Sequence, residues 1–122
     1  MTREIVLPFP DPRLSPNKRS RHKWLTDIRS IARNVGFLAA KEAGVSVPDK
    51  TPLHLFLVFN PPDNRRRDGD NINSSLKSYM DGIFSALQVD DSNIRLTTYG
   101  FGKRVKGGQV IARLEVLQKE AK

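Results

Sequence analysis

The stretch LHLFLVF, residues 53–59, is the sequence feature that most limits how this chain can fold. The run is almost wholly apolar and is closed by Asn60, Pro61 and Pro62, so it predicts a buried strand. A buried strand must be covered by other elements of the same chain. The elements available to cover it are two segments whose apolar residues recur at helical intervals.

These two segments have the spacing of amphipathic helices. The first spans about residues 20 or 21 to 43 and stops at Gly44. Its apolar residues are Trp24, Ile28, Ile31, Val35 and Leu38. The second begins with a cap at Asp70 or Asn71 and ends at about Gln88. Its apolar residues are Ile72, Leu76, Met80, Ile83 and Leu87. Each helix therefore has one apolar face that can pack on a sheet.

Three further strands complete the predicted fold. The chain opens with a strand over residues 4–9, after which a run of prolines imposes an extended basic arm that cannot be helical. Segments 94–103 and 109–117 have strand character, and the Lys-Gly-Gly turn between them is typical of an antiparallel hairpin. The order is strand, helix, strand, helix, strand, strand. We expect one α+β domain over residues 1–122, with two helices on one face of a small mixed sheet.

The composition excludes several classes of protein. There is no cysteine, which excludes disulfides, iron–sulfur clusters and thiol catalysis. Since there are also only two histidines, His22 and His54, we expect any metal to be held by oxygen. No run approaches the length needed to cross a bilayer, and the N-terminus lacks an apolar signal core. We therefore expect a cytoplasmic protein without a membrane partner. The 21 Lys and Arg against 13 Asp and Glu give a net charge of +8, which favours nucleic acid as the partner.

The charges are clustered by sign along the chain. Basic residues gather in segments 13–23, 65–67 and 103–106. Six of the 13 acidic residues lie within residues 63–91, several of them beside arginines. Carboxylates repel a phosphate unless a divalent cation lies between them. The pattern therefore favours metal-dependent phosphodiester chemistry.

The segment RRRDGDN, residues 65–71, is the strongest candidate site. It places Asp68 and Asp70 between a strand and a helix. In extended backbone, residues two apart point to the same side with Cα atoms about 6.5 to 7 Å apart, so two carboxylates can converge on one ion. Mg²⁺ prefers such oxygen ligands, and adjacent arginines can hold phosphate oxygens. The alternative is an ordinary turn and helix cap with solvated arginines.

Lys77 is a further candidate residue. On the predicted second helix, Asp70, Lys77 and Asp81 fall on one stripe away from the apolar face. A cation on this stripe can neutralise the charge that develops on a phosphoryl group. The alternative is an ordinary i,i+4 ion pair between Lys77 and Asp81 on a solvated face.

Together these features resemble the RusA family of Holliday junction resolvases, small basic homodimeric endonucleases of phage and bacteria. The resemblance covers nearly the whole chain and includes the segments IVLPFPDPRLSPNKR, RRRDGDN, LKSYMDGIFSAL and VDDSNI. It implies a single domain related to this family, with a cytoplasmic location. It also implies that Asp68, Asp70 and Asp91 bind Mg²⁺ as essential carboxylates, with Asp90 as an accessory residue.

The resemblance also implies that a lysine of the second helix assists catalysis. The family places this lysine four residues after the second aspartate, where this chain has Ser74. Lys77 keeps the family's four-residue spacing to the next aspartate, Asp81, as expected after a three-residue insertion. We therefore assign this role to Lys77.

The function implied is resolution of four-way DNA junctions by paired symmetric cleavage, in DNA recombination and repair, with no small-molecule substrate. The expected DNA contacts are Asn17, Lys18, Arg19, Arg21, Arg65, Arg66, Arg67, Lys103, Arg104 and Lys106. Two other classes stay open. One is a nucleic-acid-binding module without catalysis, and the other is a metal-dependent nuclease that acts on flapped DNA or on RNA.

The position of Asp91 presents a geometric difficulty. A straight helix over residues 71–88 separates its ends by roughly 25 Å, so Asp91 cannot reach Asp70 within one subunit. One solution is a helix that is shorter, or is broken near Gly82. The other is a composite site, completed by the Asp90 and Asp91 loop of a second subunit.

Overall fold

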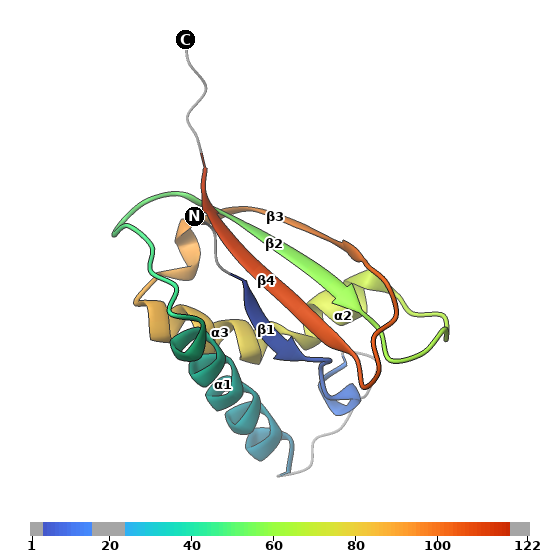
Figure 1. Cartoon of the computed structure of the whole chain (residues 1–122). Coiled ribbons are helices and arrows are strands. Elements are labelled where there is room, and N and C mark those ends of the chain that lie inside the picture. The colour runs from blue at the N-terminus through green and yellow to red at the C-terminus, as the bar shows by residue number, and fades with distance from the viewer. Residues whose placement is uncertain (1–3, 16–23, 118–122) are drawn as a thin grey trace.

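The computed structural model describes residues 4–15 and 24–117. It is a mixed α+β fold in which three α-helices accompany one four-stranded sheet in the described part of the chain (Figure 1). The strands are β1 (Ile5–Pro8), β2 (Leu53–Asn60), β3 (Ile94–Phe101) and β4 (Gln109–Val116). The helices are α1 (Trp24–Ala43), α2 (Gly69–Ser75) and α3 (Lys77–Leu87), with 3₁₀ turns η1 (Pro12–Leu14) and η2 (Asp91–Asn93). The α+β class predicted from the sequence is confirmed, with three helices in place of two.

The strand order in the sheet is β1-β4-β2-β3. Strand β4 lies antiparallel to both β1 and β2, while β2 and β3 are parallel. The predicted hairpin between the last two strands is therefore wrong, because β2 lies between them. The connection after β3 passes around the end of β2, where the Val105 amide donates to the Pro61 carbonyl at 2.9 Å. Gly107 and Gly108 then adopt φ values of 78° and 73°, which favour glycine.

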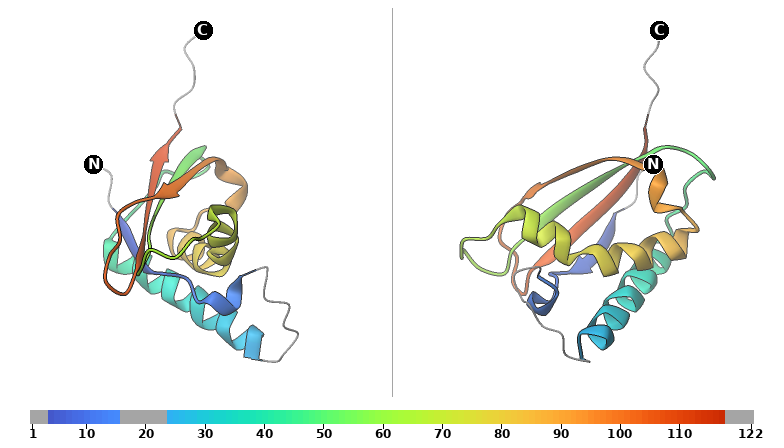
Figure 2. Two further views of the ribbon diagram at one scale, coloured as in Figure 1. Left: turned by 90° about the vertical axis from the view of Figure 1, so that its right-hand side faces the viewer. Right: turned by 180° about the vertical axis from the view of Figure 1, so that it is seen from behind.

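The helices cover one face of the sheet, as the sequence predicted, and leave the other open (Figure 2). Alternate residues of β1, β2 and β4 point into the core, which includes Ile5, Leu55, Phe59 and Val110. On the open face Val6 is 56% exposed and other apolar side chains are similarly accessible. None of the helices in residues 4–15 and 24–117 is long and apolar enough to cross a membrane.

The predicted second helix is in fact two helices. It starts earlier than predicted, because Asp68 rather than Asp70 or Asn71 is the N-cap. It is interrupted at Leu76, which is fully buried and separates α2 from α3. The Ser75 hydroxyl donates to the Asn71 carbonyl at 2.8 Å, a side-chain bond that competes with the helical pattern and often bends helices. The break therefore lies at Leu76 rather than near Gly82.

For the first helical segment, the described residues include the predicted C-terminal end but not the predicted start. Helix α1 ends at Ala43, and Gly44 adopts a φ of 66°, which confirms the predicted stop. Its predicted start at Ser20 or Arg21 lies outside the described residues.

The proline-rich arm departs from the extended conformation predicted for it. Residues 12–14 form the turn η1, and the Asp11 side chain caps it by accepting from the Arg13 amide at 2.9 Å. Proline is compatible with this turn because Pro12 occupies its first position, where no intrahelical amide donor is needed. A hydrogen bond also attaches residue 11 to the rest of the fold, since the Asp11 amide donates to the Tyr79 hydroxyl at 3.2 Å.

Helices α1 and α3 approach each other through glycine. A Cβ added at Gly82 would lie 1.9 Å from the Arg33 carbonyl oxygen. One added at Gly36 would lie 2.0 Å from the Tyr79 carbonyl oxygen. The two helix backbones are therefore in direct contact, which is possible only because both positions lack a side chain. This contact fixes α3, and hence the end of α2 attached to it, against the rest of the fold.

Candidate functional site

The carboxylates Asp68 and Asp70 lie side by side at the start of α2. Asp68 is extended, with φ −93°, and its side chain accepts from the Asp70 amide at 2.8 Å. Asp70 is already in the first helical turn, so the pair is not the fully extended arrangement predicted. The alternative of a helix cap is therefore correct for Asp68. Both side chains nevertheless remain exposed, so capping does not remove them from solvent.

Tyr99 of β3 is a member of this site that the sequence analysis missed. Its hydroxyl donates to Asp70 Oδ1, and its ring stacks on Phe59 with centroids 5.4 Å apart. A Cβ at Gly69 would lie 3.1 Å from the Tyr99 ring, so the glycine lets α2 sit close to β3. The hydrogen bond to Asp70, followed by burial and the charges of Asp70 and Asp68, raises the pKa of Tyr99. No local sequence signal links Tyr99 to a partner 29 residues away.

We expect Asp70→Asn to lower the pKa of Tyr99 toward the ordinary value of 10.0, because the substitution removes the anion that opposes phenolate formation. The chain has two tyrosines, and burial raises the pKa of the other, Tyr79. A titration that follows phenolate absorbance should therefore show one transition moving down and one remaining in place. Asp81→Asn serves as the control and should move neither. Unchanged transitions in Asp70→Asn would contradict the Tyr99 contact.

The three consecutive arginines have three different environments. Arg67 donates to Asp63 at 2.8 Å, lies 5.3 Å above the Phe9 ring and is only 15% exposed. Arg65 is exposed and pairs with Asp63 at 3.3 Å. The hydrogen bonds from Arg67 and the Arg65 amide lower the pKa of Asp63 to about 2. Arg66 is exposed and makes no ion pair with a described residue, so it is the arginine best placed to meet a ligand.

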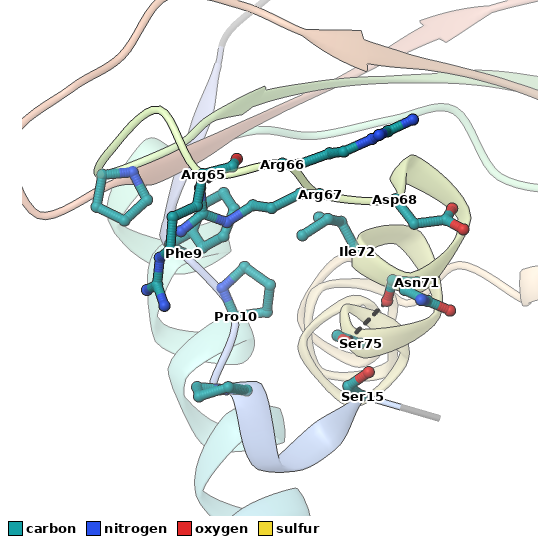
Figure 3. A pocket seen from close by; sticks show the side chains of 12 residues that line it. Phe9, Pro10, Ser15, Arg65, Arg66, Arg67, Asp68, Asn71, Ile72 and Ser75 are labelled. Carbon is teal, nitrogen blue, oxygen red and sulfur yellow. Dashed lines mark hydrogen bonds between the residues drawn. The ribbon is translucent and has the colours of Figure 1, made fainter. Parts of the chain in front are cut away.

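A cavity of about 540 Å³ opens beside Asp68 (Figure 3). One wall comes from the N-terminal segment and the other from the loop before α2 and from α2 itself. Its lining residues are Phe9, Pro10, Pro12, Ser15, Pro62, Arg65, Arg66, Arg67, Asp68, Asn71, Ile72 and Ser75. Sequence analysis identified the arginines and Asp68 but not the apolar residues opposite them.

Lys77 lies in a different hollow from the one beside Asp68. Its amine is 3.5 Å from Asp81, and its side chain is 76% exposed, so the predicted i,i+4 pair is present but loose. The second hollow, of about 360 Å³, is lined by Lys77 together with Arg29 and Arg33 of α1. The two α1 arginines were not predicted, because nothing in the sequence shows that α1 packs beside Lys77. These three cations line one cavity together with the carboxylate of Asp81.

The second basic segment predicted to contact DNA lies at the same end of the sheet as Asp68. Lys103, Arg104 and Lys106 are exposed in the connection after β3, and Val105 in the same loop is bonded to Pro61. Pro61 belongs to the loop that leads from β2 to Asp68. The remaining predicted DNA contacts, Asn17, Lys18, Arg19 and Arg21, lie outside the described residues.

Asp90 and Asp91 lie at the opposite end of the sheet. They precede β3, whose first residue pairs with Leu53, whereas Tyr99 pairs with Leu57 near the other end of the same parallel ladder (Figure 1). That ladder runs from Leu53 to Phe59 and spans roughly 20 Å. Asp90 caps η2 by accepting from the Ser92 amide at 3.0 Å, which lowers the pKa of Asp90. Breaking the helix at Leu76 therefore does not bring Asp91 to Asp70.

The donor set at Asp68 and Asp70 fits a hard divalent cation only in part. In each carboxylate one oxygen is engaged by Tyr99 or by the Asp70 amide, and the described residues give the other oxygen no hydrogen-bond partner. Two exposed carboxylates suit Mg²⁺, which commonly keeps waters and substrate phosphate as its other ligands. Within residues 4–15 and 24–117, no three His, Asp or Glu side chains gather closely enough to hold a metal ion. Among the described residues, this end of the sheet therefore offers two carboxylates, Asp68 and Asp70, to such an ion.

Comparison with known proteins identifies a related protein but provides no information on activity. No protein-family profile matches the chain. An uncharacterized protein of Xylella fastidiosa is 36% identical over 92 residues, which make up 71% of this chain. The aligned segment is 59% of the relative, so the chain matches about three fifths of that protein's length.

Proposed function

We propose that this chain is a Mg²⁺-dependent, structure-specific endonuclease of the RusA type, which resolves Holliday junctions by paired symmetric strand cleavage in DNA recombination and repair. The observation that carries the proposal is the pair of exposed carboxylates, Asp68 and Asp70, at an end of the sheet that also presents Arg66 and the exposed basic loop after β3. A phosphodiester is negatively charged, so it can bind the basic side chains directly and can bind the carboxylates through a metal ion.

In this proposal Asp68 and Asp70 hold Mg²⁺ together with a third carboxylate, Asp91, and Asp90 is accessory. When bound, Mg²⁺ polarises the scissile phosphate and lowers the pKa of a coordinated water. Tyr99 orients the Asp70 carboxylate through its hydrogen bond. Arg66 stabilises negative charge on the phosphate, while Arg65 and Arg67, through Asp63, hold the loop that carries it.

Lys77 takes a broader role than the single catalytic lysine expected from the resemblance. Its hollow is also lined by the two α1 arginines and by Asp81, so three cations and one carboxylate share it. Such a group holds the DNA backbone by charge, which makes binding strongly dependent on salt. We retain Lys77 as a candidate for stabilising transition-state charge, with Arg29 and Arg33 as phosphate contacts beside it.

The separation of Asp91 from Asp70 supports a homodimer with composite sites. Strand β3 is an edge strand of the sheet, and no strand of the described residues pairs with its outer side, which leaves that side available to a second chain. If two β3 edges pair antiparallel, the start of one strand faces the end of the other. This arrangement would carry the partner subunit's Asp91 toward the end at which Asp70 and Tyr99 lie. A two-fold dimer also matches the symmetry of a four-way junction.

Two other functions remain as alternatives, and a specific observation favours the first of them. A nucleic-acid-binding module without catalysis is favoured by the structural bonds of Asp68 and Asp70, which cap a helix and accept from Tyr99. A metal-dependent nuclease for flapped DNA or RNA needs the same site with a differently shaped substrate.

We propose that the protein acts on DNA in the cytoplasm of a bacterial cell, with neither a membrane nor a small molecule as its partner.

A panel of matched substrates tests the proposed function. Wild-type protein is incubated with a synthetic four-way junction, a flapped duplex, a linear duplex and a single-stranded RNA, each with Mg²⁺ or with EDTA. We expect paired symmetric cuts in the junction only, and only with Mg²⁺. Preferential cutting of the flap or the RNA would establish the second alternative. Junction binding that is insensitive to EDTA, with no cleavage of any substrate, would establish the binding module.

A further inference from the structure

The cavity beside Asp68 has two kinds of wall, apolar on one side and charged on the other. Its apolar part comes from Phe9, Pro10, Pro12, Pro62 and Ile72. Figure 3 shows Phe9 and Pro10 on the N-terminal side of the opening, across from Ile72 of α2. Among the described residues these apolar side chains are left lining an open cavity, although apolar surface is stabilised by contact. A preformed hollow of this kind is typical of a ligand site.

We propose that this cavity receives one unstacked nucleobase of the DNA strand whose phosphate lies at Asp68 and Asp70, and so determines sequence preference at the cut. The inference rests on the proposed nuclease function and adds a subsite to it. A volume of about 540 Å³ is within the range of about 300 to 1,000 Å³ usual for small-ligand sites. It suits a base with its sugar, whereas a stacked duplex is far too large to enter.

The position of Asp68 connects the cavity to the carboxylate pair. Asp68 lines the cavity, and it is also bonded to the Asp70 amide at 2.8 Å. A base bound in the cavity therefore places its own backbone beside the carboxylates and the exposed Arg66. Positive charge at the rim matches the phosphate of a nucleotide, while the apolar wall matches the faces of a base. An apolar peptide would supply no counter-charge to Arg66, the arginine that makes no ion pair with a described residue.

Asn71 supplies a group that can distinguish bases. Its backbone carbonyl accepts from Ser75 at 2.8 Å, but its side-chain amide has no hydrogen bond to a described residue. In Figure 3 Asn71 lies beside Asp68 at the charged side of the cavity. A side-chain amide offers one acceptor and two donors, and it pairs in bidentate fashion with the edge of a matching base.

The cavity is held open by contacts that do not involve a ligand. Arg67 bridges its two walls, since it donates to Asp63 in the loop and lies over the Phe9 ring of the N-terminal segment. A second contact attaches the N-terminal segment to α3, since the Asp11 amide donates to the Tyr79 hydroxyl. The base is therefore expected to enter a preformed site, without a large rearrangement of the protein.

The test uses four-way junctions that carry 2-aminopurine, a base whose fluorescence rises when it leaves the stack, at successive positions near the branch point. Ca²⁺ replaces Mg²⁺ in the binding assays, and cleavage with Mg²⁺ is measured separately on a library of junction sequences. The variants are Asn71→Ala, its matched control Asn73→Ala in the same helix, and Ile72→Phe, which fills the cavity. Circular dichroism and thermal melting establish that each variant is folded.

We expect a severalfold fluorescence rise at one position with wild-type protein and with Asn73→Ala, and its loss with Ile72→Phe. Asn71→Ala should reduce discrimination between bases at that position by about tenfold, the size of one bidentate base contact. Symmetric cleavage without any cavity-sensitive fluorescence, and with unchanged preference in Asn71→Ala, would overturn the subsite while the nuclease function stands. Cavity-sensitive fluorescence without cleavage would support the subsite and overturn the nuclease. Absence of both signals would overturn both proposals.

Discussion

Replacing Asp70 with asparagine is expected to lower the rate of Mg²⁺-dependent junction cleavage by about a thousandfold, with little change in junction binding. Asparagine keeps the size of the side chain and can still accept from Tyr99, so the fold around α2 should persist. It loses the negative charge that holds a divalent cation. A contribution of several kcal/mol from the metal corresponds to about three powers of ten in rate.

The measurement is single-turnover cleavage of a four-way junction, with binding followed separately in EDTA. Asp49→Asn is the matched control, because Asp49 is an exposed aspartate in the loop before β2, well apart in sequence from the site. The control should cleave at the wild-type rate. An Asp70→Asn protein that cleaves at that rate would remove Asp70 from the metal site and favour a purely structural role for it.

Gly82→Ala is expected to destabilise the protein by about 3 kcal/mol or more. The new methyl group would lie 1.9 Å from the Arg33 carbonyl oxygen, which is backbone and cannot move aside as a flexible side chain can. The helices α1 and α3 must therefore separate, and overpacking of this kind commonly costs about 1 to 3 kcal/mol and sometimes more. Urea unfolding followed by circular dichroism measures the effect.

Gly100→Ala is the matched control for this substitution. Gly100 lies in β3, where an added Cβ would meet no atom within 4 Å, so its replacement should change stability little. Equal stability of Gly82→Ala and Gly100→Ala would contradict the backbone contact between α1 and α3. A loss of stability in Gly82→Ala alone would confirm it.

Local patterns predicted most of the helices and strands. The end of α1 followed from Gly44, and the strand β2 followed from LHLFLVF and the prolines after it. Pairing between strands was harder to predict from the sequence, because it depends on contacts between distant segments. A Lys-Gly-Gly turn favours a hairpin, yet β2 is so apolar that the sheet buries it between β3 and β4.

The sequence predicted the charged residues of the candidate site but not the residues that contact them. The two carboxylates and the arginines are contiguous in sequence, so their motif could be seen directly. Tyr99 was missed, because its contact with Asp70 exists only once β3 lies beside β2. The different environments of the three arginines could also be recognised only from the folded structure. The guanidinium of Arg67 lies over the ring of Phe9, which is 58 positions earlier in the chain.

The composite arrangement, in which two chains together form each metal-dependent cleavage site, is the central proposal for this protein. It is tested most directly by mixing Asp70→Asn and Asp91→Asn proteins under conditions that exchange subunits. A four-way junction and Mg²⁺ are then added. A heterodimer has one site with both aspartates intact, so random exchange should restore about one quarter of the wild-type sites. The product should be junctions nicked in one strand. If labelled subunits exchange freely and no cleavage returns, the two aspartates do not act across the interface and the composite site is wrong.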